Sequence, residues 1–205
     1  MRGAGGSFGI ATSIEVTTHP APPSATVFQY TWDLSVKDAT DAVAAFQSFV
    51  ETGVPPEFGA YLNLFHGSTS GKIGVVLNGG WYGPPKGFNA TIAPFLSKIS
   101  TTPRTTLNVG SYINSVTAFG QGTGVPSLNT SAPAKRDTFY AKSLMTPENS
   151  PMSTSAIMAL MNYLAHEGFS SSMVCVSLSS LHVILRFLRS HGYARSSYTE
   201  ARIRR

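Results

Sequence analysis

The sequence of 205 residues contains very little cysteine and few charges. Its single cysteine, Cys175, excludes an internal disulfide framework and a zinc cluster built on cysteines. Charged residues make up 12% of the chain, where about a quarter is usual, and this composition is common in secreted proteins. No apolar run approaches the ~20 residues of a membrane span, and no apolar signal core follows Met1. We therefore expect neither a membrane segment nor a signal peptide.

The net charge of +5 arises in one terminal segment. Residues 1–172 hold nine Lys or Arg and nine Asp or Glu, whereas residues 173–205 hold six Arg and one acid, Glu200. The basicity therefore says nothing about partners of the main domain. The segment 173–205 allows three interpretations: a basic arm for nucleic acid or a membrane, a final strand and helix, or sequence never selected to fold with the body. Its exclusive use of Arg and its many Ser favour the third.

Motifs of several common enzyme classes are missing. The glycine-rich segment over residues 3–9 lacks the third glycine of a dinucleotide fingerprint, and no Gly-Lys-Ser/Thr of a Walker loop follows it. Its backbone could still approach a flat or phosphorylated ligand, although a plain turn is the simpler interpretation. The five histidines show neither an i, i+4 pair nor H-E-x-x-H, so we predict no metal site. No Gly-x-Ser-x-Gly elbow occurs, and we assign no catalytic residue.

The hydrophobic pattern predicts an α+β fold, a mainly antiparallel sheet with helices packed on one face. We expect the first helix to be capped by Asp38, and the last to be capped by Ser153 with an apolar stripe at Met158, Met161 and Leu164. Strands are expected at about 13–16, 25–34, 59–66, 71–83 and 136–145, and helices at about 39–51, 89–99 and 151–168.

Two further groups of residues are candidates for sites. Asn89 and Asn129 each begin an Asn-x-Ser/Thr sequon and are candidate N-glycosylation positions. Trp81, Tyr82 and Tyr140 lie on expected strands or at their ends. Such aromatic residues usually belong to a core or its rim, and a carbohydrate cleft is the alternative.

Six stretches of the chain, taken together, resemble fungal FAD-linked oxidases. The family is the berberine-bridge-enzyme-like, glucooligosaccharide-oxidase-like branch of the vanillyl-alcohol-oxidase superfamily. The resemblance runs from Arg2 to about Ser172 with the order preserved. The stretches are RGAGGSFGIATSIEVTTHPAP, PPEFGAYLNLFHGSTSGK, GGWYGPPKGFNATIAPFL, GSYINSV, DTFYAKSLMTPENSPMS and MNYLAHEGFSS.

This resemblance implies a division of the chain. Residues 1–24 would be the terminal remnant of an FAD-binding domain, and residues 25–172 the substrate domain, an incomplete sheet that faces the flavin. Residues 173–205 lie outside the match and are expected to be disordered or poorly packed. Tyr140 and Asn63 are the sheet residues implied to face the substrate. The implied contacts to FAD are Gly5, Gly6, Ser7, Phe8, Gly9 and Ile10.

The resemblance also implies an activity for a complete relative. A base removes the proton of a sugar or alcohol hydroxyl, hydride passes to the flavin, and O₂ reoxidises it. Such relatives are secreted, and they hold the flavin through a His and often a Cys upstream and take the base, a Tyr, from a C-terminal segment. We find no counterpart of either, and Cys175 does not match. We therefore expect a fragment or mis-spliced product, truncated at both ends and inactive alone, with no nucleic-acid or membrane partner.

Two other classes stay open at this point. One is a non-enzymatic carbohydrate- or protein-binding module with a basic tail. The other is nucleic-acid binding through residues 173–205, which would be strongly salt-dependent and which we rank last.

Overall fold

The computed structural model describes residues 13, 15–119, 139–140, 150–166, 172–177 and 188–190, and these form one sheet flanked by helices. The sheet has the order β4-β1-β3-β2-β6-β7-β5, and every pair of neighbours is antiparallel. Its strands are β1 (Ala25–Ser35), β2 (Phe58–His66), β3 (Lys72–Trp81), β4 (Arg104–Gly110), β5 (Phe139–Tyr140), β6 (Ser172–Ser177) and β7 (Leu188–Ser190). The helices are α1 (Val36–Glu51), the 3-10 turn η1 (Pro85–Gly87), α2 (Phe88–Leu96), α3 (Tyr112–Phe119) and α4 (Thr154–His166).

One face of the sheet, called the core face here, is apolar. Successive side chains of a strand point to opposite faces, so every second residue of β1 can reach the same layer. In β1 these residues are large and buried, and the central strands β3 and β2 continue the layer. The buried side chains of the core face are Phe28, Tyr30, Trp32 and Leu34 of β1, Ile73, Val75, Leu77 and Trp81 of β3, and Phe58, Ala60, Leu62 and Leu64 of β2.

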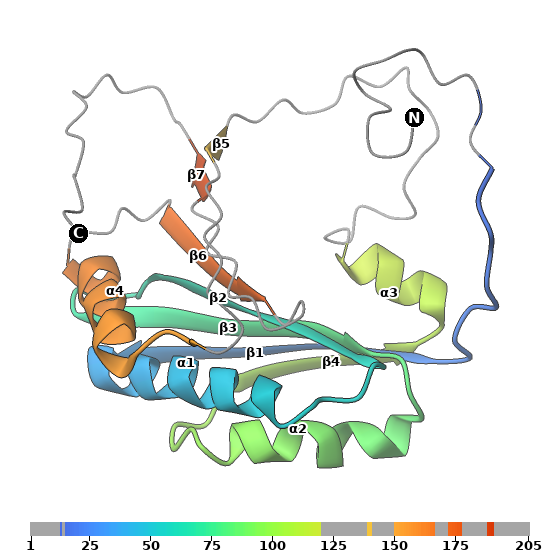
Figure 1. Cartoon of the computed structure of the whole chain (residues 1–205), viewed down its shortest axis with the longest axis horizontal. Coiled ribbons are helices and arrows are strands. Elements are labelled where there is room, and N and C mark those ends of the chain that lie inside the picture. The colour runs from blue at the N-terminus through green and yellow to red at the C-terminus, as the bar shows by residue number, and fades with distance from the viewer. Residues whose placement is uncertain are drawn as a thin grey trace.

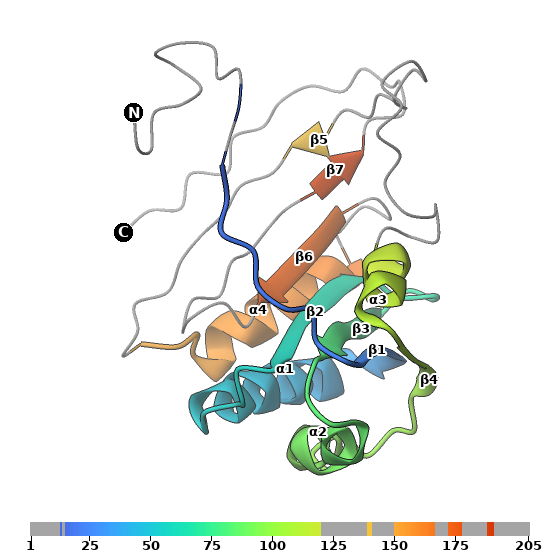
Figure 2. The same ribbon diagram turned by 90° about the vertical axis from the view of Figure 1, so that its right-hand side faces the viewer.

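Helices α1, α2 and α4 cover the core face, whereas α3 lies on the other side of the sheet (Figures 1 and 2). Phe46 of α1 and Phe95 of α2 meet edge to face, with ring centroids 5.6 Å apart. Trp32 of β1 also belongs to this cluster, and the centroids of its ring and that of Phe95 are 6.4 Å apart. Its indole N–H donates to the backbone oxygen of Thr101 at 3.0 Å. The expected α+β class is thus confirmed.

The first helix begins earlier than expected, and its cap is a different residue. Ser35 is the N-cap: its hydroxyl oxygen accepts from the backbone N–H of Asp38 at 3.1 Å. The Ser35 hydroxyl in turn donates to the Asp38 carboxylate at 2.7 Å. Asp38 therefore lies three residues inside the helix, where its negative charge also suits the helix dipole. The expected cap at Asp38 was wrong because both residues have capping side chains and the chain turns at the first.

The last helix confirms one expectation and corrects another. Ser153 caps α4, because its hydroxyl oxygen accepts from the Ala156 backbone N–H at 3.3 Å. The buried stripe contains Met161 and Leu164 as expected, but it starts from Ile157, and Met158 is 41% exposed. Positions 157, 161 and 164 follow the i, i+4, i+7 spacing of one helix face, which position 158 leaves.

Some elements did not follow from the sequence. Residues 15–24, part of the expected first strand and its connector, form no regular element. Strand β4 was not predicted, and its side chains are exposed at every position except Gly110. Leu107 is 46% exposed and Val109 is 65% exposed. The strand has only two apolar side chains, Leu107 and Val109, which is too short an alternation to identify a strand.

The sheet continues into the segment expected to be poorly packed. Residues 173–177 belong to β6, which pairs with β2 from Tyr61↔Ser177 to Phe65↔Met173. Val174 and Val176 are buried in the core. These residues correct the expected boundary at Met173, because β6 extends the core face next to β2. Of the remaining positions to 205, only 188–190 are described. None of the described helices is long and apolar enough to cross a membrane.

Candidate functional site

The face opposite the core face, called the open face here, is polar. It carries the alternate residues of the same strands, and few of them are apolar. Helix α3 covers one part of it, beside β1 (Figure 1). The polar residues of the open face include Gln29 and Thr31 of β1, Tyr61 and Asn63 of β2, Asn78 of β3, and Thr106 and Asn108 of β4.

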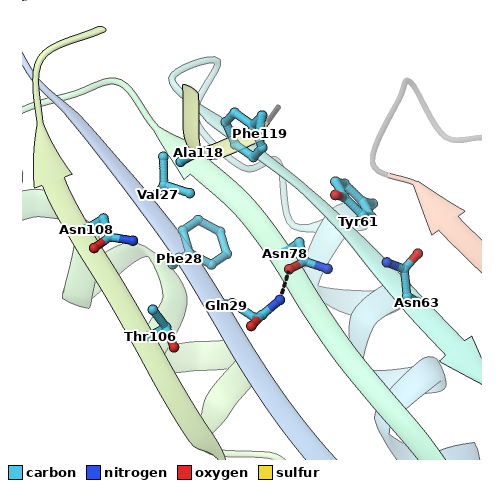
Figure 3. A pocket seen from close by; sticks show the side chains of 10 residues that line it. All are labelled: Val27, Phe28, Gln29, Tyr61, Asn63, Asn78, Thr106, Asn108, Ala118 and Phe119. Atoms are coloured by element: carbon cyan, nitrogen blue, oxygen red, sulfur yellow. Dashed lines mark hydrogen bonds between the residues drawn. The ribbon is translucent and has the colours of Figure 1, made fainter. Parts of the chain in front are cut away.

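A cavity of about 400 Å³ lies on this face (Figure 3). The sheet supplies its floor, and Ala118 and Phe119 at the end of α3 supply one wall. None of the residues that line it is a carboxylate, a lysine, an arginine or a histidine. The cavity therefore suits an uncharged polar ligand. Its lining is Val27, Phe28, Gln29, Tyr61, Asn63, Asn78, Thr106, Asn108, Ala118 and Phe119.

The sheet register brings the amide side chains of the cavity together. Gln29 of β1 pairs with Asn78 of β3, and Asn78 pairs in turn with Tyr61 of β2. The Gln29 side-chain amide N–H donates to the Asn78 side-chain oxygen at 2.8 Å. Because that oxygen is engaged, the Asn78 side chain has its NH₂ group left to donate to a ligand.

Asn63 holds the most informative atom of the cavity. Its side-chain oxygen Oδ1 is buried and accepts no hydrogen bond from the part of the chain that the structure describes. A buried acceptor without a donor costs about 1–3 kcal/mol, and such atoms in native structures call for an explanation. Figure 3 shows Asn63 at the edge of the cavity, beside Tyr61. The Asn63 oxygen lies on the side of β6, whereas its NH₂ group lies on the side of Asn78, so the NH₂ group is the part of this side chain that faces a ligand in the cavity (Figure 3).

The other predicted site residues lie elsewhere. Tyr140 is in β5, paired with Arg189 of β7, and two strands separate β5 from β2 in the sheet. The structure therefore does not place Tyr140 beside Asn63. Asn89 is exposed in α2, on the core-face side and away from the cavity. The expected FAD contacts from Gly5 to Ile10 and the sequon at Asn129 lie outside the described residues.

Sequence reasoning missed two other amides of the same cavity, Gln29 and Asn78. Gln29 lies between Phe28 and Tyr30, and Asn78 interrupts an otherwise apolar strand. A polar amide at an alternate position of an apolar strand was the available signal, since it marks the face that helices do not cover. The pairing of Gln29 with Asn78 depends on strand register, which the sequence alone did not provide.

Comparisons with known proteins show which proteins this chain is similar to. No family model matches the chain. The FAD-linked oxidoreductase dpmaF of Metarhizium anisopliae is 28% identical over 171 residues, which cover 82% of this chain and 30% of that protein. The chitooligosaccharide oxidase of Gibberella zeae is 27% identical over 173 residues, 84% of this chain and 33% of that protein. The chain thus spans about a third of the length of the curated relatives it matches.

Solved structures share the fold. BBE-like 1 of Physcomitrella patens matches with a TM-score of 0.68 and 17% identity, over 85% of this chain and 40% of that one. A chitooligosaccharide oxidase matches with a TM-score of 0.68 and 20% identity, over 84% of this chain and 39% of that one. The expected resemblance is confirmed: the chain is similar in sequence to fungal FAD-linked oxidoreductases and has the fold of berberine-bridge-enzyme-like proteins.

Proposed function

We propose that this chain supplies the substrate side of an FAD-linked oxidoreductase, with the open face of its sheet turned toward the flavin and the substrate. The observation that carries the proposal is the group of side-chain amides, Asn63, Asn78 and Gln29, in a cavity that no charged residue lines. The similarity to FAD-linked oxidoreductases supports the cofactor class. In this proposal residues 1–24 contribute to the FAD-binding part, and the substrate domain extends from residue 25 through β6.

The described residues fit a polar ligand of the flavin-and-sugar type. The open face offers side-chain amide groups, and no charged residue lines its cavity. FAD, when bound, supplies the acceptor for a hydride taken from the substrate carbon and passes the electrons to O₂. The backbone of the segment from Gly5 to Ile10 is the proposed contact to the cofactor, since four glycines in residues 3–9 allow close approach.

We propose a sugar or a similar alcohol as the substrate. The NH₂ groups of Asn63 and Asn78 donate hydrogen bonds to substrate oxygens. Together they orient the ring over the sheet before reaction, which is the positioning role that a substrate domain plays in catalysis. One of the relatives carries the name chitooligosaccharide oxidase, which supports an oligosaccharide as the first ligand to test.

We further propose that this chain alone does not turn over substrate. The family's covalent flavin attachment and its tyrosine base have no counterpart that we identify in the 205 residues. Purified chain should therefore show no visible flavin absorbance and should produce no peroxide with cello-, malto- or chito-oligosaccharides. Bound flavin together with peroxide production would contradict this part of the proposal.

The binding role is tested by calorimetric or NMR titration with the same oligosaccharides. We expect the Asn63→Ala variant to bind roughly tenfold more weakly, because one of the amide donors of the cavity is then missing. The matched control is Asn162→Ala, since Asn162 is exposed on α4 and its side chain bonds only within that helix, to the Met158 oxygen. Equal binding by the Asn63 variant would overturn the assignment of the site.

A non-enzymatic carbohydrate-binding module would also bind sugar through this face. The two classes separate on the encoded sequence next to the chain. Extending the protein with the in-frame upstream codons should introduce a covalent-flavin motif and yellow protein if the oxidoreductase proposal holds. Sugar binding that persists while the extended protein stays colourless would favour the binding module.

Secretion and glycosylation belong to the same proposal. Asn89 is exposed in α2, and its sequon threonine, Thr91, donates its hydroxyl to the Gly87 backbone oxygen at 3.0 Å. Because α2 lies on the core-face side, a glycan at Asn89 would leave the open face accessible. Expression through a fungal secretory pathway should give a product whose mass falls on glycosidase treatment, and Asn89→Gln should remove that part of the shift.

A further inference from the structure

A second cavity lies at the end of the sheet where β3 and β4 finish. It has a volume of about 470 Å³ and shares no lining residue with the cavity of the open face. Four segments that are distant in sequence contribute to it: the connector before β1, the turn before β2, the residue after β3 and the first residue of α3. Its lining is Pro22, Pro56, Glu57, Tyr82 and Tyr112.

Two tyrosine rings form a notch in this cavity. The ring centroids of Tyr82 and Tyr112 are 6.0 Å apart, and the ring planes are inclined by 51°. Rings at this angle are tilted relative to each other and do not stack. The faces of aromatic rings carry negative electrostatic potential, and a cation within about 6 Å of a ring centroid is attracted to it.

The position of Tyr82 is fixed by contacts with Glu57 and Gly80. Its backbone N–H donates to the Glu57 backbone oxygen at 2.9 Å, which ties the residue after β3 to the segment before β2. Its side chain lies against Gly80, where an added Cβ would come 3.2 Å from two ring carbons, Cε2 and Cζ, and from the hydroxyl oxygen of Tyr82. The absence of a side chain at Gly80 permits this close approach. The Tyr82 ring is therefore ordered before any ligand binds, which lowers the entropic cost of binding.

The charge of the cavity has one sign. Glu57 is the one charged residue among those that line it, and the two prolines present apolar rings without an N–H. The amide groups at the start of α3 are turned to their own cap, since both oxygens of Ser111 accept from the Asn114 N–H. The lining thus combines negative ring faces, a carboxylate and apolar surface, but it lacks the side-chain amides of the open face.

We propose that this second cavity is a binding site for a small organic cation of the alkylammonium class. The methyl or methylene groups of such a ligand contact Pro22 and Pro56, and its positive nitrogen lies between the tyrosine rings and near the Glu57 carboxylate. A bare metal ion does not fit, because a single carboxylate is too few ligands. A neutral sugar is better served by the amides of the other cavity.

Choline is the probe that tests the site in the full chain, by NMR or calorimetric titration against its neutral isostere 3,3-dimethylbutan-1-ol. We expect choline to bind with a dissociation constant in the millimolar range and the neutral alcohol to bind at least about fivefold more weakly. Equal binding of the two compounds, or no choline binding at about 50 mM, overturns the proposal.

Variants locate the site. Tyr112→Leu should weaken choline binding about fivefold and Glu57→Gln about threefold, because each removes one attractive group. Tyr163→Leu is the matched control, since Tyr163 on α4 is 41% exposed and Tyr112 is 42% exposed. Unchanged thermal unfolding of each variant excludes misfolding as the cause. Loss of choline binding in the Tyr163 variant, or its persistence at full strength in the Tyr112 variant, contradicts the assignment.

Discussion

The two faces of the sheet differ in whether their buried side chains are left with an unpaired hydrogen-bonding group. On the core face Phe28 is 1% exposed and contacts other aromatic rings, with centroids 5.4 Å from Phe58 and 5.0 Å from Phe88. On the open face the next residue along, Gln29, is exposed, and its side chain hydrogen-bonds to that of Asn78 on the neighbouring strand β3. The core face is complete without a ligand, whereas the open face retains a buried acceptor at Asn63. The packing that stabilises the fold thus lies on one side of these strands, and the site that we propose for a ligand lies on the other.

The sharpest test of this difference uses neighbouring residues of β1. We expect Phe28→Ala to lower the free energy of unfolding by about 3–5 kcal/mol, because it leaves a cavity among aromatic rings. Gln29→Ala should change it by only about 0.5 kcal/mol. Urea denaturation followed by fluorescence measures both. Similar losses for the two variants would mean that both faces carry the stability.

Glycines of β2 and β3 give the second test. A Cβ at Gly79, on the core face, would lie 2.3 Å from the Gly59 backbone oxygen and 2.4 Å from a Phe28 ring carbon. A Cβ at Gly59 meets nothing within 4 Å. Gly79→Ala should therefore destabilise the protein by about 3 kcal/mol, whereas Gly59→Ala should be neutral or slightly stabilising. The two denaturation midpoints are compared. An unchanged midpoint for Gly79→Ala would show that the packing of the core face can adjust to the added methyl group.

The third test removes the unsatisfied atom of the open face. Asn63→Leu has a similar volume and no buried acceptor, so we expect the free energy of unfolding to rise by about 1 kcal/mol while sugar binding is lost. Asn162→Leu on α4, where the side chain is exposed, serves as the control. A less stable Asn63→Leu variant would indicate that the Asn63 oxygen has a hydrogen-bond partner in the folded protein.

The smallest expected effect concerns pH. Burial in the core face raises the pKa of Tyr30 above 10.0, because the charged phenolate is poorly solvated there. The unfolded chain then loses this proton at lower pH than the folded protein. Tyr30 thus contributes stability below about pH 10, and this contribution is lost as the pH rises through the folded pKa. Tyr30→Phe should flatten the alkaline decline of the unfolding temperature, and an identical decline in both proteins would contradict it.

Much of the fold could be read from local patterns. The long strands β1, β2 and β3 alternate or are continuously apolar between clear turns, and the cap of α4 at Ser153 is a local signal. Two features could not be read in this way. Strand β4 is exposed on both faces, and β6 was hidden in a segment whose Arg and Ser content suggested no fold. Both are held by pairing with a distant strand, which leaves little trace in their own composition.

The site followed from the sequence only in part. Asn63 was implied by the family resemblance, and the structure adds the reason, a buried oxygen without a donor. Gln29 and Asn78 were missed because their contact joins residues 49 positions apart through the register of β1 and β3. The notch of Tyr82 and Tyr112 likewise depends on where β3 and α3 end relative to each other. Juxtaposition of this kind is a property of the whole sheet.

The exposed strand β4 has a practical consequence for handling the protein. Among the described strands it pairs only with β1, and neither a lysine nor a proline interrupts it between Arg104 and Gly110. Because Leu107 and Val109 are exposed, a second polypeptide can pair with this edge strand and extend the sheet. Self-association should therefore grow as preparations are concentrated. A Leu107→Lys change would act as a gatekeeper that keeps samples monomeric for the titrations above.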